Sequence, residues 1–108
     1  MNGTDDILDA VYQIILERKN NPTEQSYVAS LYAKGLDKIL GKIGEEATEV
    51  AVAGKGGDPE QVVCEAADLL FHLLVLLGHY DLPPERVYKE LRRRFGTSGL
   101  AEKAARSK

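Results

Sequence analysis

One stretch of this sequence constrains the fold more than any other: from Val62 to Leu77, thirteen of sixteen residues are apolar. A helix that is apolar on nearly every side is buried in its fold. The exceptions are Glu65, Asp68 and His72, and on a helix that turns about 100° per residue their spacing places them in one narrow stripe. Because they interrupt the run, the stretch predicts a core helix and not a membrane span. We expect His72 to be a buried histidine with satisfied hydrogen bonds, not a metal ligand.

The acidic residues of this stripe need positive partners. Burying an unpaired carboxylate costs on the order of several kcal/mol, so Glu65 and Asp68 must meet cations or take up protons. A preceding predicted helix, from about Leu36 to Ala53, carries Glu46 and Glu49 along the edge of its apolar face. If the two helices pack antiparallel, they offer an all-oxygen cage that suits a hard cation, Mg²⁺ or, as a substitute, Mn²⁺. The predicted metal ligands are Glu46, Glu49, Glu65 and Asp68.

The beginning of the apolar helix carries a strong start signal. Asp58 is a favourable N-cap, Pro59 occupies the first helical position, and Gln61 stands where a capping box needs it. We expect this helix to end near Leu77 and to be followed by a turn over residues 78–84.

Periodic apolar residues and helix breakers predict the other elements. One helix runs from about Thr4, a favourable N-cap, to Lys19, and another opens at Pro83-Pro84. Residues 23–35 fit either a loop or a short helix, and a glycine-containing break at residues 96–99 precedes a last short helical stretch. No segment alternates like a strand. The sequence therefore predicts an all-α fold, a four- to five-helix bundle in a single domain over residues 1–108.

Charge and composition narrow the class of protein. The net charge is -3 and the basic residues are scattered, apart from Arg92–Arg94 and the C-terminal end, so a nucleic-acid surface is not indicated. Cys64 is the single cysteine, which excludes an intrachain disulfide and a Cys-based zinc site; we expect it to serve packing. The first six residues are acidic where a secretion signal would be basic. The sequence predicts a soluble cytoplasmic protein without nucleic-acid or membrane partners.

The two carboxylate pairs form a recognisable pattern. Glu46-x-x-Glu49 is followed sixteen residues later by Glu65-x-x-Asp68. In this the chain resembles the all-α nucleotide pyrophosphohydrolase superfamily, the MazG-like enzymes, whose signature is a paired ExxE and ExxD on adjacent helices. Between about Ile7 and Arg106, four stretches are similar more closely to the phosphoribosyl-ATP pyrophosphatase family. They are SY at 26–27, KILGKIGEEATE at 38–49, EAADLLFHLLVLL at 65–77 and RFGTSGL at 94–100.

The resemblance implies hydrolysis of 1-(5-phosphoribosyl)-ATP to 1-(5-phosphoribosyl)-AMP and pyrophosphate, the second step of histidine biosynthesis. It implies magnesium on the four predicted ligands, a nucleotide substrate whose site includes Ser26, and a homodimer. Our hypothesis for the chemistry is that water activated by the metal attacks in line while Glu45 or Glu49 accepts its proton. The candidates to meet the remaining phosphate charge, each of which is alternatively a solvated surface cation, are Lys38, Lys42, Lys55 and Arg92–Arg94.

The apolar helix gives a separate reason to expect a homodimer. A short chain covers only part of such a helix, so two-fold pairing is expected to bury the region of Leu73, Leu74 and Leu77.

Two other functions stay open at this point. The first is a house-cleaning nucleoside triphosphate pyrophosphohydrolase of the same superfamily, because the metal site alone allows it. The second is a non-catalytic helical interaction module whose carboxylates pair only with lysines. A di-iron bundle is disfavoured because the chain lacks the two Glu-x-x-His motifs of such sites.

Overall fold

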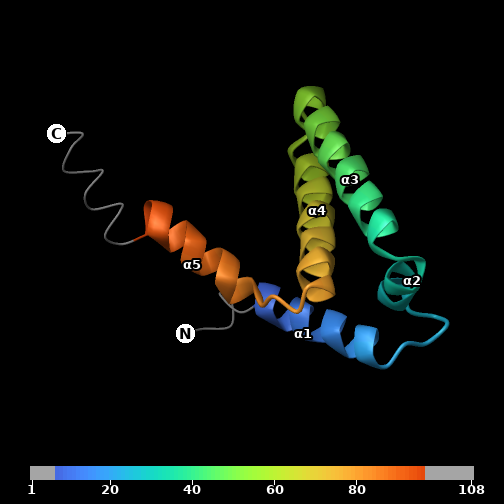
Figure 1. The fold of residues 1–108 in the computed structure, drawn as a ribbon. Coiled ribbons are helices and arrows are strands. Elements are labelled where there is room, and N and C mark those ends of the chain that lie inside the picture. The colour runs from blue at the N-terminus through green and yellow to red at the C-terminus, as the bar shows by residue number, and fades with distance from the viewer. Residues whose placement is uncertain (1–6, 97–108) are drawn as a thin grey trace.

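The computed structural model describes residues 7–96, and these form five α-helices and no strand (Figure 1). The helices are α1 (Ile7–Asn20), α2 (Tyr27–Lys34), α3 (Leu36–Gly56), α4 (Pro59–His79) and α5 (Pro84–Phe95). The predicted all-α bundle is confirmed. Residues 23–35, for which the sequence fits either a loop or a short helix, contain the short helix α2. The predicted N-cap Thr4 and the last short helical stretch lie outside the described residues.

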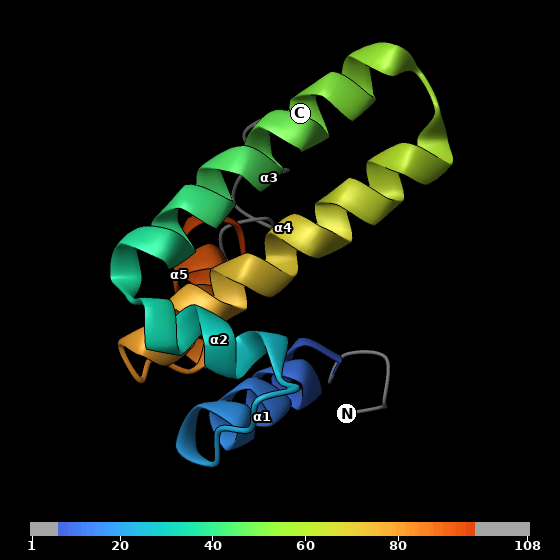
Figure 2. The ribbon, with the colours of Figure 1, turned by 90° about the vertical axis from the view of Figure 1, so that its right-hand side faces the viewer.

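The two longest helices, α3 and α4, pack side by side and antiparallel (Figures 1 and 2). Their connection is tight because Gly57 adopts the left-handed conformation, with φ of 84°, and donates its N–H to the Ala53 carbonyl. Glycine takes up this conformation without a Cβ clash. Helix α3 therefore continues beyond Ala53, its predicted end, to Gly56. The hairpin places the acidic edge of α3 opposite the polar stripe of α4.

The start of α4 agrees with the sequence in part. Asp58 is the N-cap, and its Oδ1 accepts a hydrogen bond from the Glu60 N–H at 3.0 Å. The predicted capping box is wrong, because the side-chain amide of Gln61 donates instead to Glu65 Oε2 at 2.7 Å. Gln61 thus orients the Glu65 carboxylate of the polar stripe and does not cap the start of α4.

Helices α1 and α2 complete the core at the open end of the hairpin (Figure 2). Helix α2 begins at Tyr27 because the Ser26 hydroxyl accepts the Ala29 N–H at 3.0 Å. Helix α1 packs on α4, and α2 contacts both α1 and α3. The buried apolar core comprises Tyr12, Ile15, Val28, Leu31, Ile39, Leu74 and Val75.

The C-terminal end of α4 lies later than predicted. The predicted turn starts at Gly78, but α4 runs to His79 and Gly78 is buried inside it. Tyr32 packs against this last turn, and its hydroxyl donates to the Val75 carbonyl at 2.6 Å. A Cβ at position 78 would come within 2.4 Å of that hydroxyl oxygen. Glycine is therefore needed here for the close approach of α2 to α4, not for a turn.

Helix α4 is less covered than its composition predicts. Val63, Leu70 and Leu73 are 62%, 46% and 38% exposed. Cys64 is also exposed, so its predicted packing role is wrong within this chain. Among the described residues α4 is the one helix whose length and hydropathy would suit a membrane span, and only 22% of that segment is buried. Helix α5 packs on α1 and extends away from the hairpin (Figure 1), so a single chain leaves an apolar flank of α4 open.

We expect Gly78→Ala to lower the free energy of unfolding by about 1–3 kcal/mol, the usual cost of overpacking a core. The added methyl group displaces the Tyr32 hydroxyl. Adding Tyr32→Phe removes that oxygen and should recover part of the loss, although Tyr32→Phe alone costs about 1 kcal/mol for its hydrogen bond. Urea unfolding followed by circular dichroism, at one protein concentration, measures the three variants.

Gly54→Ala is the matched control, because nothing lies within 4 Å of a Cβ built at that position of α3. It should stabilise the protein by about 0.5–1 kcal/mol, since alanine favours a helix over glycine. A Gly78→Ala protein as stable as the Gly54→Ala protein would contradict the packing role of Gly78.

Candidate functional site

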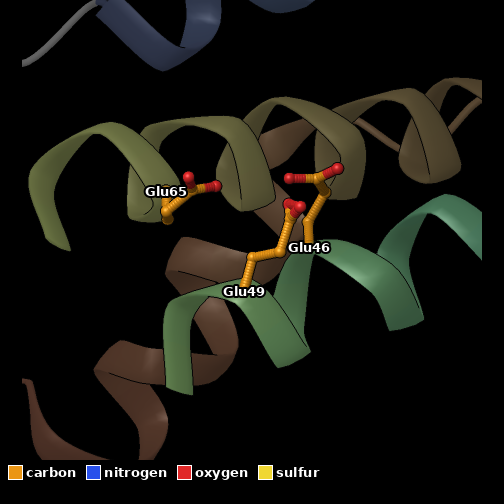
Figure 3. Close-up of side chains that lie close together, drawn as sticks. All are labelled: Glu46, Glu49 and Glu65. Carbon is orange, nitrogen blue, oxygen red and sulfur yellow. The ribbon is translucent and has the colours of Figure 1, made fainter. Parts of the chain in front are cut away.

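Three glutamates meet across the α3–α4 hairpin (Figure 3). One oxygen from each of Glu46, Glu49 and Glu65 lies within 4.8 Å of the other two. Oxygen ligands stand about 2.1 Å from Mg²⁺ and therefore within roughly 4.2 Å of one another. A small side-chain movement is enough to bring the three glutamates, called here the acidic cluster, to that spacing.

Glu46 is the buried member of the acidic cluster. It is 3% exposed, and its Oε2 lies 3.4 Å from Nζ of Lys42, one turn earlier on α3. Among the buried side-chain oxygens and nitrogens of residues 7–96, its Oε1 is the one without a hydrogen-bond partner. Leaving such an atom unpaired is costly, and a cation between the helices would satisfy it. An all-carboxylate donor set fits a hard divalent cation.

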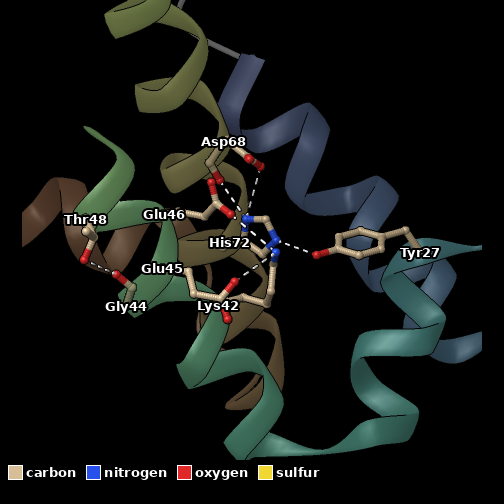
Figure 4. A network of polar contacts seen from close by, with 8 residues as sticks. All are labelled: Tyr27, Lys42, Gly44, Glu45, Glu46, Thr48, Asp68 and His72. Atoms are coloured by element: carbon tan, nitrogen blue, oxygen red, sulfur yellow. Dashed lines mark hydrogen bonds and ion pairs between the residues drawn. The ribbon is translucent and has the colours of Figure 1, made fainter. Parts of the chain in front are cut away.

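Asp68, the fourth predicted ligand, lies one turn beyond Glu65 on α4 and interacts with Glu46 (Figure 4). Its Oδ1 lies 3.3 Å from Nδ1 of His72. Asp68 is not among the residues whose oxygens all meet within 4.8 Å. The structure thus gathers three of the four predicted ligands and places the fourth against the buried one.

The facing carboxylates shift one another's pKa values. The facing Asp68 carboxyl and the Lys42 ammonium lower the pKa of Glu46, although burial opposes this. Burial and the facing Glu46 raise the pKa of Asp68, and the charge of Glu46 raises the pKa of Glu49. A divalent cation would offset the repulsion that contributes to both raised pKa values.

Lys42 is the predicted phosphate-binding cation that lies beside the acidic cluster. The pKa of Lys42 is raised: burial lowers it, but Tyr27 and the neighbouring glutamates outweigh that effect. Lys38 and Lys55 are both exposed on α3. At about 1.5 Å per residue they stand roughly 12–14 Å from Glu46 along the helix axis. Of the three lysines, Lys42 is therefore the one whose position supports the prediction.

Other predicted site residues have local partners. The Ser26 hydroxyl caps α2, and the residue is 5% exposed. Arg92–Arg94 pair with glutamates of their own helix, α5. The Glu45 side chain is 64% exposed, and its Oε1 lies 3.7 Å from Nζ of Lys42. Of the two predicted proton acceptors, Glu49 therefore lies within the acidic cluster and Glu45 on its solvent side.

Tyr27 is a neighbour of the site that the sequence did not single out. Its hydroxyl oxygen lies 2.8 Å from Nε2 of His72, and Nδ1 of His72 lies 2.8 Å from the Asp68 carbonyl (Figure 4). His72 is 2% exposed, so a buried histidine with satisfied hydrogen bonds is confirmed. The Ser26-Tyr27 pair was the sequence feature that could have indicated Tyr27. The sequence did not show where its side chain lies, because that depends on α2 beginning at Tyr27.

A hollow of about 190 Å³ adjoins the acidic cluster, lined by Glu49, Val52, Ala53, Gln61 and Glu65. Its volume is below the roughly 300–1,000 Å³ of most small-molecule sites. A single chain therefore encloses only a small hollow beside the acidic cluster.

Carboxylates that meet across two antiparallel helices are the arrangement expected from the resemblance of the sequence to the all-α nucleotide pyrophosphohydrolases. The family model described as phosphoribosyl-ATP pyrophosphohydrolase matches residues 8–95, and the chain belongs to this family. It is 68% identical over 107 residues to the phosphoribosyl-ATP pyrophosphatase of Geobacter sulfurreducens, covering 99% of each chain. It is 54% identical to the phosphoribosyl-ATP pyrophosphatase of Neisseria gonorrhoeae, covering 95% of this chain and 96% of that one. The family match includes every carboxylate of the site.

Mg²⁺ should raise the thermal stability of the protein. A ligand at ten times its Kd adds about 1.4 kcal/mol to the free energy of unfolding, or roughly 5–10 °C in Tm for a domain of this size. Glu46→Gln should abolish most of that rise, because the orphaned oxygen belongs to Glu46. Thermal melts with MgCl₂, and with NaCl at equal ionic strength, measure the effect.

Glu17→Gln is the control for this experiment, because Glu17 is exposed on α1 beside Arg18. It should keep the full Mg²⁺ response. An equal rise in Tm for the Glu46→Gln protein would place the cation elsewhere.

Proposed function

We propose that this chain hydrolyses phosphoribosyl-ATP to phosphoribosyl-AMP and pyrophosphate with Mg²⁺ as cofactor, the second step of histidine biosynthesis. The observation that carries the proposal is the acidic cluster of Glu46, Glu49 and Glu65, in a chain of the phosphoribosyl-ATP pyrophosphohydrolase family. Relatives named phosphoribosyl-ATP pyrophosphatase match along nearly their whole length. We infer that residues 1–108 act as a single domain.

The chemistry follows from what each side chain offers. Bound to the carboxylates, Mg²⁺ supplies positive charge that offsets the charge on the phosphate oxygens around the cleaved bond. The Lys42 ammonium beside Glu46 offers a further positive charge to the phosphates. The attacking water loses a proton as its oxygen bonds to phosphorus and pyrophosphate leaves, and Glu45 or Glu49 accepts that proton. The residues that hold the cation are Glu46, Glu49, Glu65 and Asp68.

Glu46→Gln should lower kcat at least about 100-fold while the helical fold persists, because it weakens binding of the Mg²⁺ ion whose charge stabilises the transition state. The assay is pyrophosphate release from phosphoribosyl-ATP with and without Mg²⁺, with circular dichroism as the check on folding. Glu17→Gln, exposed on α1, should keep wild-type activity. Near-normal turnover of the Glu46→Gln protein in saturating Mg²⁺ would remove Glu46 from the site.

A house-cleaning nucleoside triphosphate pyrophosphohydrolase would use the same carboxylates. The family match supports phosphoribosyl-ATP over that alternative, and a panel that includes dUTP and dCTP separates the two. The non-catalytic interaction module predicts no Mg²⁺-dependent release of pyrophosphate from any of these nucleotides.

We further propose that the chain works as a homodimer. Its radius of gyration is 16.5 Å, against about 13 Å for a compact domain of some 100 residues. An almost wholly apolar cavity of about 200 Å³ lies between α1, α4 and α5, and Leu70 and Leu73 line it while remaining partly exposed. Leu74 was predicted to lie in the interface but is instead buried in the chain's own core. A second copy would cover the open flank of α4.

Leu70→Glu should shift the dimer toward monomer, because it puts a charge into that apolar flank. Leu40→Glu is the matched control, since Leu40 is 45% and Leu70 46% exposed, but Leu40 lies on α3, which does not line the cavity. Light scattering at micromolar concentration measures the mass. A wild-type mass near the 11.9 kDa of one chain would rule the dimer out.

We place the protein in the cytoplasm, without membrane or nucleic-acid partners. Although α4 has the length and hydropathy of a membrane span, Glu65 and Asp68 interrupt it, and charged groups in a bilayer core are expensive. The reducing compartment also suits the exposed Cys64.

A further inference from the structure

Both ring nitrogens of His72 have hydrogen-bond partners (Figure 4). Its Nδ1 faces two oxygens of Asp68, the backbone carbonyl at 2.8 Å and the carboxylate Oδ1 at 3.3 Å. Because both oxygens are acceptors, Nδ1 carries the ring hydrogen. In a neutral imidazole the other nitrogen, Nε2, is then an acceptor. The group that faces Nε2 is the Tyr27 hydroxyl, at 2.8 Å. With the neutral ring in this tautomer, Tyr27 donates its hydrogen to His72.

This arrangement leaves the Tyr27 oxygen as an acceptor only. A phenol has one hydrogen and two acceptor lone pairs, and here the hydrogen is bonded to His72. The Tyr27 ring is held by a stacked contact with Phe71, at 6.2 Å between ring centroids, and by the edge of His72 at 5.8 Å. The residue is nevertheless 48% exposed. An anchored acceptor on a half-exposed residue beside a phosphate-cleaving site can select a donor group on the substrate.

We propose that Tyr27 accepts a hydrogen bond from a ribose hydroxyl of the nucleotide substrate and that His72 is a positioning residue that fixes the direction of the Tyr27 hydroxyl. The inference rests on the function proposed above. Phosphate oxygens are acceptors, so they cannot pair with an oxygen whose hydrogen is already committed, whereas ribose hydroxyls are donors. His72 lies one helical turn, about 5–6 Å, beyond Asp68 on α4. The ribose that carries the triphosphate is the first part of the nucleotide past the phosphates, and it suits this position.

Tyr27→Phe tests the contact with the substrate, because it removes the oxygen and keeps the ring. We expect kcat/KM for phosphoribosyl-ATP to fall about 3- to 10-fold, the effect of one lost hydrogen bond. The loss should appear mainly in KM, with an unchanged Mg²⁺ concentration for half-maximal activity. Tyr80→Phe is the matched control: Tyr80 is also exposed, at 57%, and lies at the C-terminal end of α4. An unchanged kcat/KM, or a loss confined to the Mg²⁺ dependence, would overturn the proposal.

Substrate analogues identify the partner of Tyr27. Phosphoribosyl-ATP analogues made from 2′-deoxyATP and 3′-deoxyATP each lack one hydroxyl of the ribose that carries the triphosphate. The wild-type enzyme should discriminate against one of them by about 3- to 10-fold, and the Tyr27→Phe enzyme should not. Discrimination that persists without the Tyr27 oxygen, or that is absent from the wild type, would overturn the assignment.

Two substitutions of His72 separate positioning from mere packing. The side-chain oxygen of glutamine can replace Nε2 as an acceptor for Tyr27, whereas the shorter asparagine can bond only near Asp68. We therefore expect His72→Gln to retain a higher kcat/KM than His72→Asn, and the difference to vanish when either is combined with Tyr27→Phe. Equal losses in both variants, or a difference that survives Tyr27→Phe, would contradict the positioning role.

The ¹⁵N NMR spectrum of the histidines tests the tautomer in the wild-type protein, independently of activity. The chain has two histidines, and His79→Gln assigns their signals. We expect the hydrogen of His72 on Nδ1 alone; a hydrogen on Nε2, with or without one on Nδ1, would overturn the inference. If the wild type releases no pyrophosphate from phosphoribosyl-ATP, the proposed function fails. If the wild type is active and Tyr27→Phe is unaffected, only this inference fails.

Discussion

The crowding of carboxylates between α3 and α4 is the constraint on which the rest of the structure depends. Glu46, Glu49 and Glu65 approach within 4.8 Å, and Asp68 lies against Glu46. Among residues 7–96, Lys42 is the cation paired with the buried Glu46. An arrangement so unfavourable in the absence of a cation persists only if the backbone enforces it. The tight turn at Gly57 and the capped start of α4 at Asp58 do so, because together they set the register in which the two helices face each other.

Much of this arrangement could be predicted from local patterns. Apolar residues at helical spacing give the helices, and the same period gathers Glu65, Asp68 and His72 on one side of α4. A short connection between two long helices makes them antiparallel neighbours. The acidic cluster and the pairing of Lys42 with Glu46 follow from these two facts, since each requires only positions along a helix and the direction of its neighbour.

The features that escaped prediction depend on contacts between segments far apart in the sequence. Gly78 looks like a helix breaker, yet it lies inside α4, where the Tyr32 hydroxyl occupies the place of a Cβ. The hydrogen bond between Tyr27 and His72 joins residues 45 positions apart and requires α2, a helix that periodicity left open. The exposure of Cys64 reflects how few helices one chain can lay against α4. Sequence patterns indicate which face of a helix is apolar, but not whether the chain has enough other helices to cover that face.

The polar stripe of α4 has an order that follows the chemistry of a nucleotide. Glu65 stands at the acidic cluster, Asp68 joins that cluster to His72, and His72 directs the Tyr27 hydroxyl. Successive turns of one helix thus pass from a group that attracts cations to a neutral group that accepts hydrogen bonds. A rigid helix keeps Glu65 and His72, two turns apart, at about 10.5 Å along its axis, which fixes the spacing between charge neutralisation and recognition of a neutral sugar. Under the proposed function, this spacing favours a nucleotide whose ribose lies roughly 10 Å from the cation-binding carboxylates. Inorganic pyrophosphate, or a triphosphate without a sugar, offers no ribose hydroxyl to Tyr27.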